Sequence, residues 1–328
     1  MTTILSPYMP NLTVAVIGPE GYAGSLGKKG TVSDITFYNQ KSGDATITCI
    51  EPSRYPEKLS SLFFSISMAG MAILVVDEIN PAFGECVLML DMANVKKGIL
   101  VLRNYLSPDQ VAPLVKGTVV EHYSPQSDDH NILRELLLEE AKKVQPQKEG
   151  SQGGSVPVDH HFPVKGVGIV VLGGVAEGTI HTHDQLKVLP TQKVAHLRSI
   201  QKHDDDVTEA SAGDRVGLAL KGVEVEDLDR GFVLSNNPSL VASHILNGRA
   251  ELVRYWPAPL KEQMVVYLGH WMQFIPARIA FVNNAGDWKR PEITLRSEKD
   301  LVYPPGATVL IHYLEGGKLR VVGRLVPA

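Results

Sequence analysis

A glycine-rich stretch near the N-terminus has the residue types of a phosphate-binding loop. It reads GPEGYAGSLGKKGT from Gly18 onward, directly after an apolar run. Such a loop needs a glycine, four residues and then Gly-Lys-Ser/Thr, because backbone amides surround the phosphates, the lysine reaches them and the hydroxyl binds magnesium. Counted from Gly18, those positions fall on Ala23, Gly24 and Ser25, so the lysine is missing. The sequence therefore predicts a vestigial phosphate loop made of Gly18, Gly21, Gly24 and Ser25.

A shifted reading frame does not restore the motif. With Lys28 as the motif lysine, Tyr22 takes the place of the leading glycine and Lys29 the place of the hydroxyl. One alternative stays open, in which Lys28 or Lys29 reaches the phosphates from outside the usual frame.

The elements around this stretch indicate a doubly wound α/β domain over residues 1–145. The runs LTVAVIG, DATITCIE, MAILVVDE, GILVLRN and GTVVEHYS are typical of strands, and helical patterns lie between the last four and after them. The central runs are continuously apolar, which indicates burial on both faces of a parallel sheet covered by helices.

The composition changes after this domain. Residues 146–157 are polar and rich in Gly, Gln, Ser and Pro, as flexible linkers are. Beyond them, short apolar runs follow one another with glycine turns and without helical periodicity, which predicts two β-barrels, over 158–240 and 241–328.

Composition and charge narrow the choice of partners. The net charge is -4, but residues 241–328 carry eleven basic residues against seven acidic ones, which favours an anionic partner for the last domain. No apolar run is long enough to span a membrane and no secretory leader is evident, so we expect a cytoplasmic protein without a membrane partner. Cys49 and Cys86 stand in apolar surroundings and are expected to be reduced core thiols.

The first predicted barrel resembles domain two of the elongation factor Tu superfamily. The resemblance covers roughly 75 residues and rests on GVG at 166–168, Gly178, Asp184, the strand AGDRVGLALKG and the pair Arg230-Gly231. Within the superfamily the chain is most similar to archaeal and eukaryotic selenocysteine-specific elongation factors, and less so to the gamma subunit of the initiation factor that delivers initiator tRNA. The resemblance implies a degenerate GTPase-like domain followed by elongation factor Tu-like domains two and three.

The GTPase motifs of that superfamily fail in this chain. Only about 25 residues separate Ser25 from Glu51, which is too few for the magnesium-binding switch segment. The Asp-x-Pro-Gly-His motif corresponds to EPSRY, where Arg54 replaces the glycine and Tyr55 the histidine. The guanine-reading Asn-Lys-x-Asp corresponds to RNYL, in which Leu106 cannot accept the protons of the base. We therefore expect no GTP or magnesium binding and no GTP hydrolysis, as in a pseudo-GTPase.

Three polar residues of the barrel are candidates for an aminoacyl pocket. In selenocysteine-specific factors an Asp-His pair and the Arg of the GDR strand surround the charged selenocysteine side chain, and Asp159, His160 and Arg215 match them. An arginine beside a protonatable histidine suits an anion. The alternative is that Arg215 is a structural strand residue and that Asp159 and His160 lie where the linker ends. No metal site is predicted, because the histidines lack further ligands at suitable spacing.

The basic third domain is the predicted contact surface for RNA. Its candidates, expected to meet the phosphate backbone of tRNA or another RNA, are Arg249, Arg254, Arg278, Lys289, Arg290 and Arg296. Trp256, Trp271 and Trp288 could stack on bases, although burial inside the barrel is the more frequent use of such residues.

Three functions follow as alternatives. The first is a paralogue of the selenocysteine-specific factor that binds tRNA, other RNA, the ribosome or translation factors, but not DNA, without a nucleotide. The second is a GTP-dependent aminoacyl-tRNA delivery factor with an atypical loop. The third is a protein-interaction scaffold without RNA binding. Because the chain ends at Ala328, it is expected to lack the C-terminal domain of selenocysteine factors, which argues against ordinary selenocysteine delivery.

Overall fold

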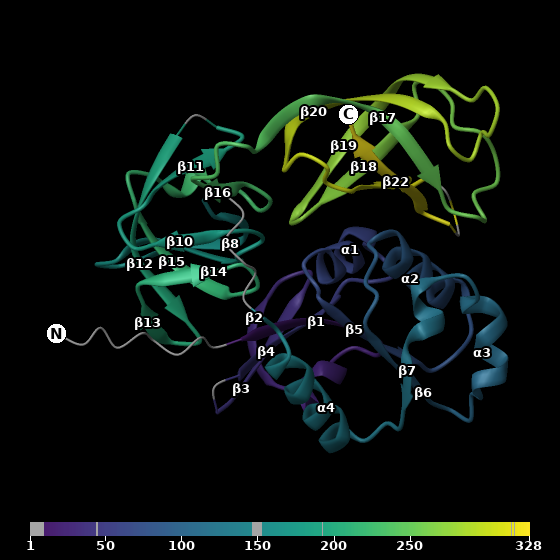
Figure 1. Cartoon of the computed structure of the whole chain (residues 1–328), viewed down its shortest axis with the longest axis horizontal. Helices are drawn as coiled ribbons and strands as arrows, with labels where there is room; N and C mark the ends of the chain where they lie inside the picture. Colours follow the sequence, from purple (N-terminus) through teal and green to yellow (C-terminus); the bar gives the residue numbers. More distant parts are fainter. Residues whose placement is uncertain (1–9, 44, 146–152, 192, 316, 318) are drawn as a thin grey trace.

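The computed structural model describes residues 10–43, 45–145, 153–191, 193–315, 317 and 319–328. They form an α/β domain and two β-barrels (Figure 1). The predicted fold class is therefore confirmed. Most of the predicted linker, 146–152, lies outside the described residues.

A seven-stranded sheet forms the centre of the α/β domain. Its strand order is β2-β3-β4-β1-β5-β6-β7, with β4, β1, β5, β6 and β7 parallel and the β2–β3 hairpin antiparallel to them. The strands are β1 (Asn11–Ile17), β2 (Lys28–Val32), β3 (Thr36–Ser42), β4 (Ala45–Glu51), β5 (Met71–Val76), β6 (Gly98–Leu102) and β7 (Ser124–Gln126).

Helices cover both faces of this sheet. The helices are α1 (Leu59–Ser67), α2 (Pro81–Met92), α3 (Pro108–Val115) and α4 (His130–Lys142), with short 3₁₀ turns η1 (Tyr22–Ser25) and η2 (Val119–His122). Helix α4 packs on one face, and α1 and α2 lie on the other, facing the third domain (Figure 1). Asn80 and Asp129 cap α2 and α4 by accepting backbone N–H bonds. Within the described residues, no helix combines the length and apolar character needed to cross a membrane.

Two parts of the sequence prediction for this domain were wrong. The hairpin of β2 and β3 was not predicted, because β2 is largely exposed at the edge of the sheet and shows no apolar pattern. The run GTVVEHYS was predicted as a strand, but four of its eight residues form η2, and only the three residues of β7, which begins at the end of the run, extend the sheet.

The second domain is a barrel that the pairing of β11 with β12 closes. Its strands are β8 (Ser155–Val164), β9 (Gly168–Gly174), β10 (Thr179–His181), β11 (Gln185–Leu189), β12 (Lys193–Lys202), β13 (Asp205–Val207), β14 (Glu209–Ser211), β15 (Arg215–Lys221) and β16 (Val233–Ser235), with the 3₁₀ turn η3 (Val225–Asp227). Strand β8 begins at Ser155, inside the stretch predicted as linker, because Ser155 to Pro157 pair with β16.

The third domain is a closed barrel in the order β17-β20-β19-β18-β21-β22. Its strands are β17 (Val241–Leu252), β18 (Val265–His270), β19 (Gln273–Asn283), β20 (Glu292–Tyr303), β21 (Val309–His312) and β22 (Val321–Pro327). The predicted strand ELVRYWP was misplaced, since β17 ends at Leu252 and the following residues form a turn.

Candidate functional site

The vestigial phosphate loop already holds an anion, the side chain of Glu51. Its carboxylate is 2% exposed at the end of β4. Oε1 accepts a hydrogen bond from the amide of Gly21 at 2.6 Å, and Oε2 accepts one from the amide of Ala23 at 2.9 Å. Backbone amides of this kind are the groups with which a phosphate loop binds phosphate. Glu51 therefore occupies two backbone donors of this loop.

The other residues of the loop have structural roles. A side chain at Gly18 would lie 2.7 Å from the Cβ of Val75 in the neighbouring strand, and Gly21 has a φ of 82°, which glycine adopts readily. The amide of Gly24 donates to the carbonyl of Gly21 at 3.0 Å. Ser25 is exposed, and its carbonyl accepts a bond from the Nε of Arg134 at 2.8 Å.

No long helix follows this loop. The 3₁₀ turn η1 spans four residues, and the chain then enters β2, in which Lys28 and Lys29 are exposed and pair with β3. A phosphate loop relies on the amides and dipole at the start of a helix to hold its anion. The observed loop therefore lacks both the lysine in register and the helix start.

Polar side chains interact with one another at the edge of the sheet that was predicted to correspond to the base-reading site. The Nε of Arg103 lies 3.3 Å from Oδ1 of Asp77 and 3.2 Å from Oδ2 of Asp128. The hydroxyl of Tyr22, on the vestigial loop, donates to Oδ1 of Asp128 at 2.7 Å. Burial, followed by the bond to Asp128, raises the pKa of Tyr22 above its usual range. This network joins the ends of β5, β6 and β7 to the loop.

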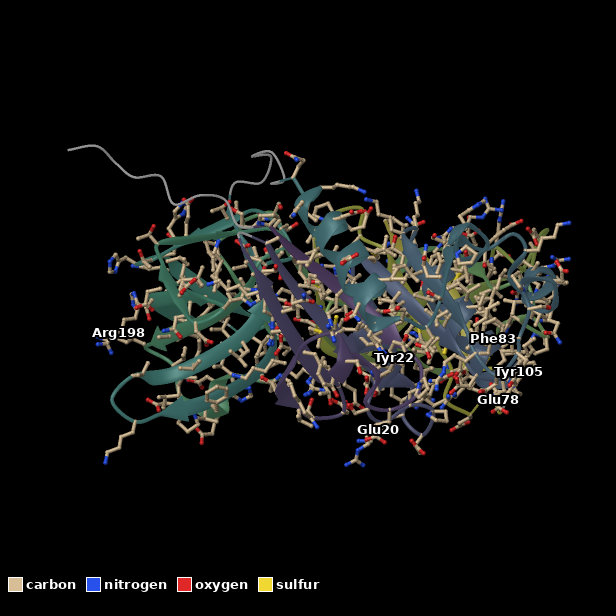
Figure 2. The ribbon with its side chains drawn as sticks, turned by 90° about the horizontal axis from the view of Figure 1, so that it is seen from below. Glu20, Tyr22, Glu78, Phe83, Tyr105 and Arg198 are labelled. Atoms are coloured by element: carbon tan, nitrogen blue, oxygen red, sulfur yellow. The ribbon has the colours of Figure 1, made fainter. Side chains whose placement is uncertain are left out.

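Exposed side chains surround the same edge. Glu20, Glu78 and Tyr105 lie on one side of the α/β domain, far from Arg198 of the second domain (Figure 2). Tyr105 is fully exposed, and Leu106, predicted as the residue that removes base recognition, packs against the hydrophobic core instead.

The three aminoacyl-pocket candidates form one cluster in the second domain. Arg215 donates to both carboxylate oxygens of Asp159, with Nη2 to Oδ1 at 3.0 Å, and the Nδ1 of His160 lies 2.7 Å from the same Oδ1. Asp159 is 4% exposed and belongs to β8, so these residues do not lie in a linker. The predicted proximity of the three residues is present, and their aminoacyl role stays a prediction.

The α/β domain covers this cluster. The ring of Phe37, from β3, lies under the guanidinium of Arg215 at 4.1 Å and meets the ring of His160 edge-on at 5.9 Å. A cavity of about 50 Å³ remains beside Asp159 and Arg215. Because Asp159 balances the charge of Arg215, the pair offers no free cation to an anionic side chain.

Histidines elsewhere in the second domain do not gather metal ligands. His181 lies 3.5 Å from Glu209 and 4.0 Å from Asp184, all three partly exposed. Among the described residues, no group of three or more His, Cys, Asp or Glu side chains is arranged to hold a metal ion.

The RNA-contact candidates of the third domain separate into two groups. Arg278 on β19 and Arg296 on β20 stand directly opposite each other and line a groove of about 400 Å³, together with Gln263, Val265 and Pro276. Both arginines are exposed, and neither forms an ion pair within the described part of the chain. Glu298 also lines this groove, and Nη1 of Arg278 donates to the carbonyl of Gln263 at 3.2 Å. Two arginines against one carboxylate still leave the groove with a net positive charge, which favours an anion.

The other candidates lie around the end of β17. They are Arg249, Arg254, Lys289 and Arg290. The Nζ of Lys289 donates to the carbonyls of Val253, Arg254 and Trp256 at 3.3, 3.0 and 2.5 Å. Lys289 is therefore occupied in closing this turn, and burial lowers its pKa. Trp256 is buried, so it does not present a stacking face to RNA.

Comparisons with known proteins give this geometry its context. The profile of elongation factor Tu domain 2 matches residues 168–235. An uncharacterised protein of Methanocaldococcus jannaschii is 36% identical over 317 residues, which cover 96% of this chain and 99% of the relative. The selenocysteine-specific elongation factor of the same organism is 25% identical over 271 residues, 77% of this chain and 58% of that factor. This chain belongs to the elongation factor Tu superfamily.

A solved structure agrees with this assignment. The apo form of translation elongation factor SelB from Methanococcus maripaludis superposes with a TM-score of 0.79 at 23% identity, over 97% of this chain and 79% of that one. The superfamily member described here thus shares its fold with SelB, and the predicted resemblance to selenocysteine-specific factors is confirmed.

Sequence reasoning missed the residues that fill the vestigial sites. Glu51 was aligned with the magnesium-linked Asp of the superfamily, but not as a ligand of the loop; its longer side chain was the available signal. Arg103 was noted only as the start of RNYL. Tyr55, at the position of the family's histidine, donates instead to the carbonyl of Ala82 at 2.9 Å and to Glu85 at 3.1 Å.

Proposed function

We propose that this superfamily member is a translation-factor-like protein that binds tRNA or another RNA through its barrels and works without GTP or magnesium. In this proposal the α/β domain is a pseudo-GTPase that serves as a scaffold for the barrels. A cytoplasmic location, with partners among RNA, the ribosome or translation factors, is part of the same proposal.

The position of Glu51 carries the nucleotide-free part of the proposal. The amides of Gly21 and Ala23 that would face a phosphate already donate to its carboxylate at 2.6 and 2.9 Å. A nucleotide would have to displace this carboxylate and bring its own negative charge beside it. Without a lysine in register, no cation of the loop offsets that repulsion.

The base site gives independent support. Arg103 lies within ion-pair distance of Asp77 and Asp128, and Tyr22 donates to Asp128, although Oδ1 of Asp77 accepts no hydrogen bond within the described residues. Admission of a base would break these contacts, and RNYL supplies no carboxylate in the place that reads guanine.

The groove of Arg278 and Arg296 supports the RNA part. Two exposed guanidinium groups without ion-pair partners among the described residues suit phosphate oxygens, which they bind through paired N–H donors. Two of the similar proteins, the selenocysteine-specific elongation factor and SelB, are elongation factors by name. This similarity supports RNA as the anionic partner in the proposal.

Calorimetric titration with GTP and magnesium tests the first part. We expect no binding heat for the full chain, while a working elongation factor measured in parallel binds. Micromolar binding of GTP would overturn the nucleotide-free proposal and favour the second candidate, a GTP-dependent delivery factor with an atypical loop.

Titration of labelled total tRNA at rising salt tests the second part. We expect the association constant to fall steeply with salt, because bound phosphates release counterions. Absence of binding at low salt would overturn RNA binding and favour a protein-interaction scaffold.

A further inference from the structure

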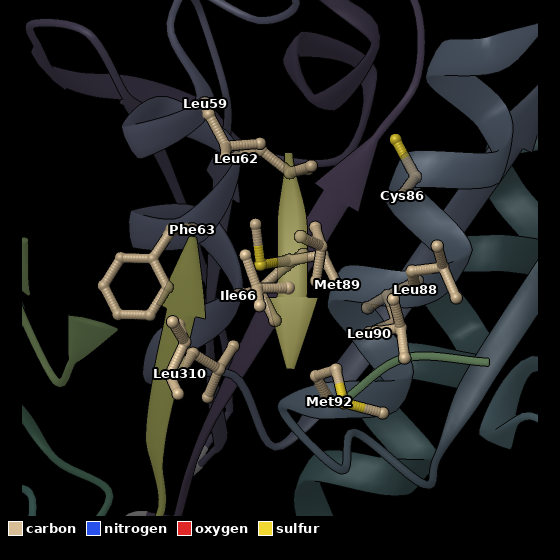
Figure 3. Packing of buried hydrophobic residues seen from close by; sticks show 14 of the residues in the cluster. Leu59, Leu62, Phe63, Ile66, Cys86, Leu88, Met89, Leu90, Met92 and Leu310 are labelled. Atoms are coloured by element: carbon tan, nitrogen blue, oxygen red, sulfur yellow. The ribbon is translucent and has the colours of Figure 1, made fainter. Parts of the chain in front are cut away.

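The third domain shares a hydrophobic core with the α/β domain. Helix α1 presents Phe63 to the ring of Phe274 at 5.6 Å and to the ring of His312 at 5.4 Å. Leu310 of β21 lies near Phe63 and Ile66 of α1 (Figure 3). The buried residues of α1, α2 and the third barrel form one continuous cluster.

The fit of this interface depends on a glycine in β18. A Cβ atom at Gly269 would lie 2.6 Å from the ring of Phe63 and 2.9 Å from the ring of His312. Real side chains do not approach that closely, so only glycine lets α1 reach the barrel at this point.

A buried ion pair joins the same two domains. Glu85, on α2, is 3% exposed, and its Oε2 lies 2.5 Å from Nη2 of Arg320, which precedes β22. The backbone amide and Nε of Arg320 both donate to Oε1 of Glu85, at 3.2 and 3.0 Å. The carboxylate therefore receives three N–H donors from one residue of the third domain.

The segment that follows β4 takes part in this contact. The Nη1 of Arg320 donates to the carbonyl of Pro56 at 3.0 Å, and the hydroxyl of Tyr55 donates to Oε2 of Glu85 at 3.1 Å. At its other end, the same segment begins with Glu51, whose carboxylate is bound by the vestigial loop. The segment is thus tied to the loop at one end and to the third domain at the other.

We propose that Glu85, Arg320 and Tyr55 form an interdomain latch that holds the third domain on the α/β domain in one fixed arrangement, without any bound ligand. The position at which the superfamily carries its water-positioning histidine, Tyr55, anchors a domain in this chain. The latch stands independently of RNA binding and of the nucleotide-free proposal.

The physical basis of the latch is the low exposure of its charges. Separation of the domains would expose the apolar faces of α1 and the barrel, and variants lacking one partner would leave the other charge buried without compensation. The apolar contacts and the ion pair together hold the domains, and the ion pair also fixes their register, since it is satisfied only when Arg320 reaches Glu85.

The test is substitution of the latch in the full chain. In Arg320→Ala we expect backbone amide hydrogen exchange in α1 and α2 to rise by about 100-fold or more, the size expected when one member of a buried ion pair is removed. Small-angle scattering should show an expanded particle, whereas addition of GTP and magnesium to the unaltered chain should change neither measurement.

Arg249→Ala is the matched control, because Arg249 is exposed on β17 and its Nε donates to the carbonyl of Arg290 in the same barrel at 3.1 Å. It should leave scattering and exchange in α1 and α2 unchanged. If Arg320→Ala does not fold, the double variant Glu85→Gln, Arg320→Met removes both charges at similar volume and should fold with raised exchange in α1 and α2. Unchanged exchange and scattering in a folded latch variant would overturn the proposal.

Discussion

The edge of the sheet in the α/β domain and the outer face of the third barrel differ in whether their charged side chains have partners within the chain. At the sheet edge, Glu51 and Arg103 each find partners within the chain. On the barrel, Arg278 and Arg296 face each other without an ion-pair partner among the described residues. A site whose polar groups are satisfied internally resists an outside ligand, while unpaired cations favour one. The difference locates the proposed binding function on the barrel.

The largest expected effect comes from emptying the vestigial loop. Glu51→Ala should lower the free energy of unfolding by about 4 kcal/mol, because the buried amide of Ala23 and the partly buried amide of Gly21 both lose their acceptor. Glu51→Gln keeps one acceptor oxygen and should cost about half as much. Urea denaturation of both variants measures these values. An unfolding free energy for Glu51→Ala close to that of the original chain would show that the loop amides do not depend on Glu51 as their acceptor. The proposed difference between the sheet edge and the barrel would then be contradicted.

Acid should destabilise the interface between the α/β domain and the third barrel. His312 is fully buried among Phe63, Phe274 and the carbonyl of Tyr267, and burial lowers its pKa from 6.5 to about 4. Between pH 6.5 and 4, the imidazole of His312 is protonated in the unfolded chain but stays neutral in the folded chain. Stability should therefore fall between pH 6.5 and 4, by about 3 kcal/mol from His312 alone.

Urea denaturation across this pH range measures the effect, with His312→Phe as the control. The variant should lose much of the acid dependence and keep the part that comes from His270, whose pKa burial also lowers to about 4. An identical pH profile for the variant would contradict the assignment to His312.

The barrel side of the comparison is tested by removing its cations. Arg278→Ala with Arg296→Ala should weaken tRNA binding by about 25-fold at physiological salt and reduce the salt slope by about two. Fluorescence anisotropy over a salt series gives both quantities. Arg324→Ala, whose charge Glu251 already balances, should change the affinity less than about twofold. An equal loss in the double variant and in Arg324→Ala would point to bulk charge and not to the groove.

The smallest effect is expected at the base edge. Arg103→Ala should lower the free energy of unfolding by about 1 kcal/mol, since its two ion pairs are partly exposed and screened by solvent. Arg103→Met, which keeps the packing of the side chain, separates lost charge from lost contact. If Arg103→Ala gained measurable guanine nucleotide binding, the site would still be able to bind a base, and the Arg103 side chain would be what prevents binding in the original chain.

Much of the fold could be predicted from the sequence, because buried strands and helices have recognisable apolar patterns. Apolar runs marked β1, β4, β5 and β6, and the amphipathic pattern marked α4. The edge hairpin of β2 and β3 has no such pattern, since β2 is largely exposed and polar. Strand β17 was misplaced because apolar residues continue beyond Leu252 through an exposed turn, on whose two sides Val253 and Trp256 are buried.

The candidate site was less predictable, because its decisive contacts join distant parts of the chain. Asp159 and Arg215, 56 residues apart, could be placed together through the family resemblance. Glu51 reaches the loop 28 and 30 residues away, and Arg320 meets Glu85 across 235 residues. No local sequence pattern predicts that the carboxylate of Glu51 accepts hydrogen bonds from the amides of Gly21 and Ala23.

The carboxylate of Glu51 can also be regarded as a ligand that never leaves. Tethered at the end of β4, it competes for the loop amides at the high effective concentration of an intramolecular group, whatever the concentration of free anions around the protein. A lysine introduced at Gly24 would therefore meet an occupied loop, and its charge would first strengthen the resident carboxylate. Under the nucleotide-free proposal, nucleotide binding would require removal of Glu51 before any motif residue was introduced.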